Sequence, residues 1–479
     1  MGVGQYNKEF SMSDVSRRDF IRHAGQSTFG ALLAGGLLGS SLKCAQSGLP
    51  VKPNIVYILA DDMGYADAGC YGQQDIQTPN IDRLCREGMR FTQHYAGHPV
   101  CAPSRCTLMT GKHTGHATRR SNRPYVPLKP DEVTVAEILK SAGYTTGAVG
   151  KWGLADTEGN FDPGTTGKPN QRGFDYFFGF LNQKHAWDYY TDFVWENEEK
   201  YMNVDKRYMH DVFTEKSLNF IRKNHQNPFY LYVPFTLPHV NNGNKHTDEA
   251  LEVPDDTPYS NEDWPQAEKN YASMVTRIDT SVGQILALLD ELNLTENTIV
   301  MFASDNGAQN YSPHTATYFK STGGLRAYKG QVYEGGVRIP FIVKWPGVVQ
   351  PGSTSDHISA FWDFMPTAAD IVGAETPKDI DGISFLPALL GKPQLEHEYL
   401  YWEFPGKTSA QGKISQAIRM GDWKSVRIGL TNPIELYNLK TDLFEEKNVA
   451  DQHPELVAKF AELFKTARTE SEHWPLPEK

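Results

Sequence analysis

The chain has 479 residues, 39% of them hydrophobic, so it holds ample apolar material for a core and is longer than one ordinary compact domain. Its formal net charge of −11 argues against a protein whose whole surface follows nucleic acid, since such proteins usually present a broad basic face. An anionic ligand would therefore need a local cationic pocket. We expect one large domain and a smaller one.

The N-terminal segment is typical of a twin-arginine export signal. Paired arginines in Ser16–Arg22 precede a Gly/Ala-rich apolar stretch, Ser27–Leu42. The alternative is a basic amphipathic helix or a membrane anchor, but the stretch is shorter than the roughly 20 residues of a spanning helix and glycines interrupt it. Cys44 invites a lipoprotein interpretation, yet Lys43 is a poor match to the small residue expected before it. We predict export to the periplasm without stable membrane insertion, residues 1–49 being signal and linker.

Strand and helix patterns alternate from residue 54 onward. Asn54–Ala60 is a short apolar run, and Asn297–Ser304 is a second one that follows an amphipathic pattern over Met274–Leu292. Alternation of this kind predicts an α/β fold with a large, mostly parallel sheet sandwiched by helices. Further expected strands are Thr145–Val149, Phe229–Val233 and Pro340–Lys344, with a helix over Val133–Ala142.

Oxygen-bearing side chains follow both apolar runs. Asp61 and Asp62 come after the first, and Asp305 and Asn306 after the second. A single acid at such a place is more often a helix cap or turn residue. However, ligand sites in open α/β sheets lie beyond the carboxyl ends of the strands, so four such groups predict a site there. Hard oxygen ligands suit calcium, with magnesium as the alternative, better than zinc.

Beyond about Asp381 the elements become shorter. They predict a small antiparallel sheet with a terminal helix, which divides the chain into residues 50–385 and an α+β subdomain over 386–479. The expected elements are strands over Glu398–Phe404, Gln416–Met420, Trp423–Ile428 and Glu435–Asn438 and a helix over Pro454–Arg468.

Five cysteines, one of them in the signal region, are too few for a disulfide framework. Most could be buried small apolar residues, but Cys101 begins the string Cys-Ala-Pro-Ser-Arg-Cys-Thr-Leu-Met-Thr-Gly that ends at Gly111. For an isolated cysteine, a buried residue at a helix start, with Pro103 in its first turn, would be the better interpretation. The whole string resembles the signature of the formylglycine-dependent sulfatases. Arg105, one helical turn after Cys101, can lie on the same face and hold the nucleophile or sulfate.

The resemblance implies an alkaline-phosphatase-like fold and a specific chemistry. A separate maturation enzyme would oxidise Cys101 to formylglycine, whose hydrate supplies an oxygen nucleophile. A serine would leave a stable sulfate ester, whereas a gem-diol can collapse to the aldehyde and expel sulfate. The string Asn54–Asp62 resembles the first metal strand of the family and Phe302–Gly307 the second. The resemblance thereby assigns the divalent metal to Asp61, Asp62, Cys101, Asp305 and Asn306.

Three more blocks resemble family motifs. Gly143–Gly153 implies that Lys151 binds sulfate, and Phe235–His239 implies that His239 protonates the leaving alcohol. Leu325–Pro340 implies that Lys329 contacts sulfate and the bridging oxygen. Singly, a lysine is usually solvated and a lone histidine usually satisfies a local hydrogen bond. Together with Arg105 and a cation, these groups would stabilise charge developing on the sulfate oxygens.

One position departs from the family pattern. Many members have a histidine after the Lys-Trp pair, where it helps orient the hydrated aldehyde, and this chain has Gly153. His116, and second to it His113, are candidates for that role, although both could equally be surface residues. The glycine is also the one feature that favours a glycan-binding protein without catalysis.

Substrate contacts are less evident. The segment Phe180–Tyr190 combines aromatic and polar residues as sugar-binding loops do, so His185, Trp187 and Tyr189 are candidate glycan contacts, although aromatic clusters are more often core. The chain resembles bacterial sulfatases acting on sulfated carbohydrates, with galactose or N-acetylgalactosamine types as the candidate sugars. A phosphonate or phosphodiester hydrolase is the rival enzyme, since relatives of this fold use the same nucleophile on phosphorus.

Overall fold

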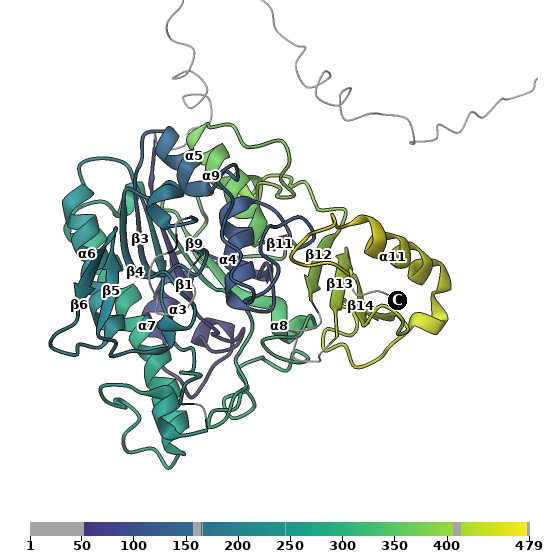
Figure 1. Cartoon of the computed structure of the whole chain (residues 1–479), viewed down its shortest axis with the longest axis horizontal. Coiled ribbons are helices and arrows are strands. Elements are labelled where there is room, and N and C mark those ends of the chain that lie inside the picture. Colours follow the sequence, from purple (N-terminus) through teal and green to yellow (C-terminus); the bar gives the residue numbers. More distant parts are fainter. Residues whose placement is uncertain (1–51, 157–163, 165, 245, 406–412, 477–479) are drawn as a thin grey trace, which may run out of the picture. The chain divides into compact units, whose positions relative to one another are not determined.

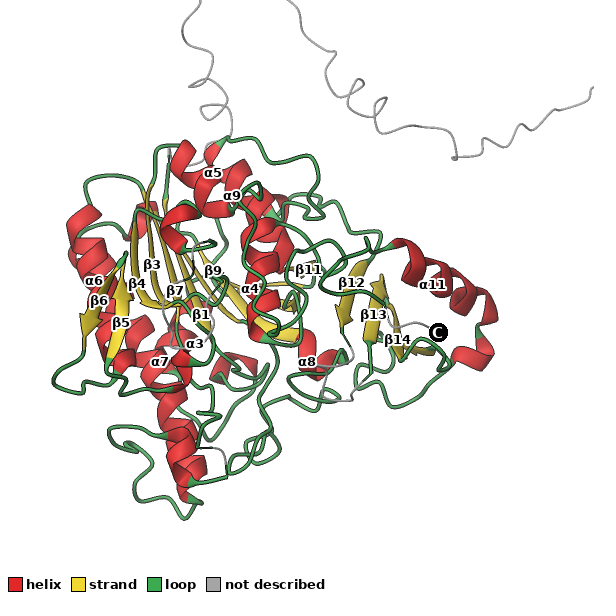
Figure 2. Cartoon of the chain, in the orientation of Figure 1, coloured by secondary structure: helices red, strands yellow, loops and turns green. Residues whose placement is uncertain are grey.

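A computed structural model describes residues 52–156, 164, 166–244, 246–405 and 413–476. The predicted signal and Cys44 lie outside these residues. Within them the chain forms a large mixed sheet covered by helices and a small antiparallel sheet (Figures 1 and 2). This arrangement confirms the predicted α/β fold class.

The large sheet is parallel at its centre and has antiparallel pairs on both sides of that centre, while β10 and β11 pair with β2 in parallel. Its order is β10-β2-β9-β8-β1-β7-β3-β4-β5-β6, and β11 pairs with β2. The five neighbours from β8 to β4 run parallel, while β9 is antiparallel to both β8 and β2. The strands are β1 (Asn54–Ala60), β2 (Met89–Tyr95), β3 (Thr145–Lys151), β4 (Tyr176–Phe180), β5 (Phe193–Glu196), β6 (Glu199–Met202), β7 (Phe229–Pro234), β8 (Thr298–Ser304), β9 (Arg338–Lys344), β10 (Ser353–Ser355) and β11 (Ser359–Ala360).

Helices bury both faces of the central strands, which explains why those strands are continuous apolar runs. In β1 the side chains of Ile55, Tyr57 and Leu59 pack in one core with helices α4, α5 and α9, and the alternate residues pack in a second core with α3, α6 and α7. The helices are α3 (Pro79–Arg86), α4 (Cys101–Thr110), α5 (Val135–Ser141), α6 (Met209–Asn224), α7 (Gln266–Glu291), α8 (Glu334–Val337), α9 (Phe364–Val372), α10 (Leu386–Leu389) and α11 (Pro454–Thr466).

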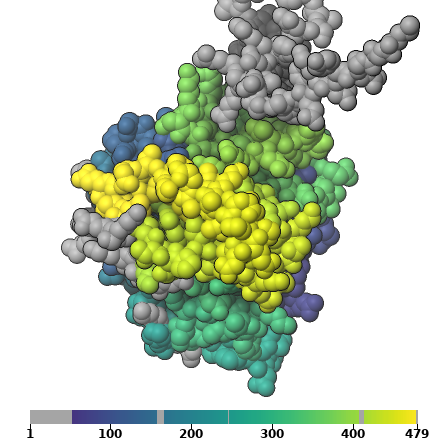
Figure 3. Space-filling view, turned by 90° about the vertical axis from the view of Figure 1, so that its right-hand side faces the viewer, coloured from purple at the N-terminus to yellow at the C-terminus, as the bar shows by residue number. Residues whose placement is uncertain are grey.

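The small sheet has the predicted antiparallel pairing. Its order is β12-β13-β14-β15, and α11 packs on it through Phe460 and Phe464. The C-terminal residues, yellow in Figure 3, cover one face of the folded unit beside green residues from earlier in the chain. The boundary at 385/386 stays a prediction. The strands are β12 (Leu400–Phe404), β13 (Ser415–Met420), β14 (Trp423–Ile428) and β15 (Glu435–Asn438).

The described helices include none with the length and apolar character needed to cross a membrane.

Candidate active site

The carboxyl ends of β1 and β8 bring four oxygen-bearing side chains together, because the two strands are parallel neighbours in register from Asn54 to Ala60. Asp62 donates its backbone N–H to Oδ1 of Asp305 at 3.1 Å, and Asn306 Nδ2 donates to Asp62 Oδ1 at 2.8 Å. Asp62 has φ +70°, a left-handed conformation that is uncommon outside glycine and that turns the chain sharply after β1. The adjacency predicted for these residues is therefore present.

Two oxygens of this cluster have no protein partner. Asp61 Oδ1 and Asn306 Oδ1 are buried, and neither accepts a hydrogen bond from any residue that the structure describes. Ligand atoms of Asp61, Asp62, Cys101 and His239 also lie within 4.8 Å of one another. Buried oxygens without a donor are unfavourable unless a cation or solvent satisfies them, so the donor set fits a hard divalent ion.

Cys101 is the first residue of α4 and is buried beside this cluster. Asn122 contacts Cys101 and the next residue: its Nδ2 lies 3.8 Å from Cys101 Sγ, and its Oδ1 accepts the Ala102 N–H at 3.1 Å. Burial raises the pKa of the thiol, although Lys151 and Lys329 oppose that rise. Asn122 lies in an irregular segment eleven residues after Gly111, outside the signature string and the other motifs, so no sequence signal pointed to it.

Arg105 lies one turn further along α4, and its guanidinium reaches the strand-end carboxylates. It donates to Asp305 Oδ2, lies 3.5 Å from Asp61 Oδ2, and donates to the backbone oxygen of Lys151 at 2.5 Å. Burial alone would lower its pKa, but Asp305 and Asp61 outweigh burial and raise it. Arg105 thus ties α4 to three strand ends.

Two lysines reach the same cluster from different parts of the sheet edge. Lys151, the last residue of β3, places Nζ 2.6 Å from Asp61 Oδ2, and Lys329 Nζ donates to Asp62 Oδ2. Burial by itself would lower the pKa of Lys329, but Asp62 and then Cys101 raise it well above its usual value. The two lysines and Arg105 supply positive charge at the site, where three carboxylates, Asp61, Asp62 and Asp305, match them.

His239 follows β7 in a loop held by Gln309. Val240 donates its N–H to Gln309 Oε1 at 2.7 Å, and Gln309 Nε2 donates to the Pro238 oxygen at 2.6 Å. His239 Nδ1 lies 2.5 Å from the Val240 oxygen, which places the ring proton there and leaves Nε2 near Asp62 Oδ2 at 3.6 Å. Burial and then Lys329 lower the pKa of His239 to about 4.

A cavity of about 290 Å³ opens onto these groups. Of the three predicted glycan contacts, Trp187 lines it. His185 lies in the core with Nε2 2.8 Å from Thr191 Oγ1, and Tyr189 is buried against Tyr208. The lining residues are Val100, Cys101, Ser121, Asn122, Arg123, Tyr125, Gln183, Trp187, His239, Asn242, Tyr311, Lys329 and Phe404.

His116 and His113 form a separate cluster. His116 Nδ1 lies 2.9 Å from Asp381 Oδ1, and the His113 ring stacks on it with centroids 4.4 Å apart. The His113 N–H donates to Asp381 Oδ2 at 2.9 Å. Neither ring is among the residues that line the cavity at Cys101, so the structure places both outside the group that surrounds the nucleophile.

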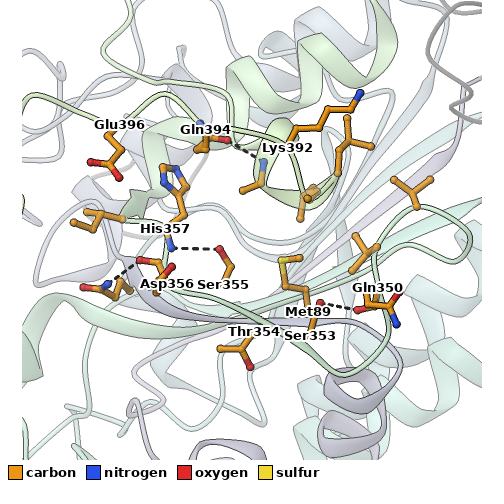
Figure 4. Close-up of a pocket in the computed structure, with 18 of the residues that line it drawn as sticks. Met89, Gln350, Ser353, Thr354, Ser355, Asp356, His357, Lys392, Gln394 and Glu396 are labelled. Atoms are coloured by element: carbon orange, nitrogen blue, oxygen red, sulfur yellow. Dashed lines mark hydrogen bonds between the residues drawn. The ribbon is translucent and has the colours of Figure 1, made fainter.

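A larger cavity, of about 1080 Å³, lies elsewhere, between β10, the segment after α10 and the turn at Gly421 (Figure 4). Its walls are held by local bonds such as Gln93 Nε2 to the Asp356 oxygen at 2.7 Å and His357 N to Ser355 Oγ at 3.3 Å. It shares no lining residue with the cavity at Cys101. The smaller cavity is the one that contains the chemistry.

Comparisons with known proteins agree with this geometry. Residues 53–374 match the sulfatase family model, and residues 327–470 match the model of the N-sulphoglucosamine sulphohydrolase C-terminal region. The N-acetylgalactosamine-6-sulfatase of Canis lupus familiaris is 31% identical over 92% of this chain and 82% of its own. The N-acetylgalactosamine-6-O-sulfatase of Bacteroides thetaiotaomicron is 30% identical over 87% of this chain and 93% of its own.

Solved structures show the same likeness. The structure of Ps i-CgsB in complex with k-i-k-neocarrahexaose superposes with a TM-score of 0.75 at 29% identity, covering 89% of this chain and 95% of that one. Phosphonate monoester hydrolase of Agrobacterium radiobacter, at 20% identity and a TM-score of 0.62, shares the fold. The family model covers most of the chain and includes Cys101 and the strand-end carboxylates, so the chain belongs to the sulfatase family and is a sulfatase of the alkaline phosphatase superfamily.

Proposed function

We propose that this sulfatase removes sulfate from a sulfated saccharide, with formylglycine at position 101 and a divalent cation. The observation that carries the proposal is the convergence of Cys101, Lys329 and His239 on one cavity, beside two buried carboxylate and amide oxygens that lack protein donors. Trp187, Tyr125 and Tyr311 in the same wall offer aromatic faces for a sugar ring. Curated relatives named for N-acetylgalactosamine sulfate favour a galactose-type sugar.

When bound, the cation supplies positive charge to the sulfate and to the nucleophilic oxygen that formylglycine hydrate provides. Calcium suits the five-ligand oxygen-rich set best, and magnesium is the alternative. Asp61, Asp62, Asp305 and Asn306 would hold the cation, and residue 101 would complete the set.

The chain's own residues bind and orient the ester. Lys329 and Lys151 lie buried beside residue 101, where their charges neutralise the sulfate oxygens in a site from which water is largely excluded. The bond between sulfur and the sugar oxygen breaks, and the sugar oxygen takes a proton as it leaves. His239 is placed to give that proton from Nε2. Its lowered pKa means that the charge of the bound sulfate must first raise its basicity.

We further propose that the chain is exported by its twin-arginine segment, acts in the periplasm and is matured by a formylglycine-generating enzyme. The basis is the sequence of residues 16–42 and the signature at Cys101–Gly111.

The proposal is tested by rates on paired substrates. Protein co-expressed with a maturation enzyme is assayed with an aryl sulfate, an aryl phosphate diester and a panel of sulfated galactose and N-acetylgalactosamine saccharides. Release of sulfate from the saccharides is the expected result. A strong preference for the diester would favour the phosphorus hydrolase instead, and an unmodified Cys101 peptide by mass spectrometry would count for a binding protein without catalysis.

A further inference from the structure

Gln183 is a buried glutamine in the wall of the cavity at Cys101. Its side chain is 5% exposed, and among the described residues neither Nε2 nor Oε1 has a hydrogen-bond partner. A carboxamide offers two donor hydrogens and an acceptor oxygen, and burying it unpaired is unfavourable. The partner of this amide is therefore expected among the contents of the cavity, which it shares with His239 and Lys329.

Gly153 makes the position of Gln183 possible. Strands β3 and β4 are parallel neighbours, and their pairing continues beyond the C-terminal end of β3. Trp152 donates its N–H to the Phe180 oxygen at 2.8 Å, and Gly153 donates its N–H to the Leu181 oxygen at 3.2 Å. Gly153 thus lies beside the chain segment that carries Gln183. A Cβ atom at Gly153 would lie 1.8 Å from Gln183 Nε2, and Gly153 has φ +77°. Any larger residue at 153 would have to displace the amide.

We propose that Gln183 is a substrate-binding residue of the sulfatase reaction, and that Gly153 is retained to admit it. The Gln183 amide donates from Nε2 to an oxygen of the sulfate group and fixes the orientation of that group toward residue 101. A sulfate offers acceptor oxygens, and the cationic side chain of Lys329 lies in the same wall. The amide carries no charge, so it aligns the sulfate without adding a titrating group. This inference rests on the proposed sulfate-ester hydrolysis.

This assignment concerns the position of Gly153 but not the role predicted from the sequence, which was to orient the hydrated aldehyde. The lack of a histidine at Gly153 led to His116 and His113, but the His116 ring pairs with Asp381, which also accepts the backbone N–H of His113. Gln183 instead fills the volume that a side chain at 153 would occupy. The sequence analysis pointed to the segment Phe180–Tyr190 that contains Gln183 but not to this residue, because the pairing of residues 151–153 with 180–181 appears only in the fold.

The first test is Gln183→Leu, which keeps the size of the side chain and removes its hydrogen bonds. We expect kcat/KM for a sulfate ester to fall about 10- to 100-fold and the inhibition constant of inorganic sulfate to rise about as much. Gln183→Glu keeps the shape and adds a negative charge, so it should lose more activity. Intact-mass analysis of the Cys101 peptide verifies that maturation is unchanged, and the Glu variant carries the test should the Leu variant fail to fold.

Gln394 provides the matched control. Its amide is satisfied by local groups, accepting from Ala388 N at 3.0 Å and donating to the Ser384 oxygen at 2.9 Å, in the wall of the other cavity. Gln394→Leu should lower the melting temperature and leave kcat/KM and sulfate inhibition unchanged. If the Gln183 variants behave in the same way, their role is structural and the proposal is wrong.

A double-mutant cycle tests the link to Gly153. Gly153→Ala should reduce kcat/KM by displacing the Gln183 amide, and in the Gln183→Ala background the same change should cost much less. Additive losses would contradict the proposed link. If the parent enzyme releases no sulfate from any ester, the proposed function fails. If the parent is active and the Gln183 variants match it, only this inference fails.

Discussion

Arg105 donates two hydrogen bonds to a single oxygen of Asp305. Nε and Nη2 lie 3.0 and 2.8 Å from Asp305 Oδ2, and both side chains are 1% exposed or less. Since Arg105 belongs to the helix that begins at Cys101 and Asp305 follows β8, this ion pair fixes the nucleophile relative to the strand-end carboxylates. Burial and then the neighbouring Asp61 raise the pKa of Asp305 to about 7, although the Arg105 guanidinium opposes that rise.

Arg105→Ala should therefore destabilise the fold strongly. Removing one partner of a buried ion pair leaves an uncompensated charge and typically costs about 3–5 kcal/mol. Urea unfolding of protein expressed without a maturation enzyme, in which residue 101 stays a cysteine, measures this loss of stability independently of activity. The exposed Arg222 on α6 gives the control, because Arg222→Ala should change the free energy of unfolding by less than about 0.5 kcal/mol. Equal stabilities for the two variants would show that the Arg105 pair contributes little.

Substitutions of the two buried cysteines on α4 distinguish a catalytic role from a packing role. Cys101→Ala should abolish turnover, since no nucleophile can be made at position 101, while the free energy of unfolding changes only modestly. Cys106 lies five residues later in the apolar core, so Cys106→Ala should lower stability by about 1 kcal/mol and keep most activity. Activity and urea unfolding are measured on both, and sulfate release by Cys101→Ala would refute the assigned role.

The central strands and the small sheet could be predicted from the sequence because their residues are uniformly apolar or regularly alternating. Trp423–Ile428 and Glu435–Asn438 were predicted with the observed bounds. Helix α7 begins at Gln266, eight residues before the predicted start at Met274, because polar residues of its first turns are buried by distant partners: Glu268 pairs with His314 at 2.7 Å. Hydrophobic periodicity carries no signal for such a turn.

Some edge strands, and some residues of the cavity at Cys101, could not be predicted from the sequence, because their local sequence lacks a regular pattern. Strand β6 is largely exposed and polar, and β2 contains an irregularity between Phe91 and His94 that breaks its alternation. Asp61 could be predicted as a site residue because it follows an apolar strand pattern, and Lys329 because it lies in a string that resembles a family motif. Asn122 and Gln183 lie in irregular segments, and only tertiary contacts bring them to Cys101.

The metal site predicts a response that does not depend on turnover. Chelation should lower the melting temperature, and calcium should restore it, since an ion that binds only the folded state stabilises it by about 2.7 kcal/mol at a hundredfold excess over Kd. Asp61→Asn should weaken that response and reduce bound calcium measured by mass spectrometry of the metal. Asp370, exposed at the end of α9, supplies the control Asp370→Asn, which should respond like the parent. An unchanged response in Asp61→Asn would contradict the ligand assignment.

The role proposed for His239 predicts that the effect of its removal depends on the acidity of the leaving alcohol. If it protonates the departing sugar oxygen, His239→Ala should reduce kcat/KM for a saccharide sulfate by about 10²–10⁴-fold. An aryl sulfate with a strongly acidic phenol needs little protonation, so the same variant should lose far less on that ester. Equal losses on both esters would indicate that His239 binds the ester without transferring a proton.

A buried histidine outside the site predicts how stability changes with pH. His397 Nε2 lies 2.8 Å from Asp363 Oδ1; burial lowers the pKa of His397, but Asp363 outweighs burial and raises it. A folded state with the raised pKa binds the proton more tightly than the unfolded chain, whose histidine titrates near pH 6.5. The stabilisation is complete below that value and is lost as pH rises through the folded pKa. In urea unfolding, the free energy of unfolding that His397→Gln loses relative to the parent should therefore be larger at pH 6 than at pH 9. A loss that grew toward pH 9 would mean that burial, not Asp363, determines the pKa of this histidine.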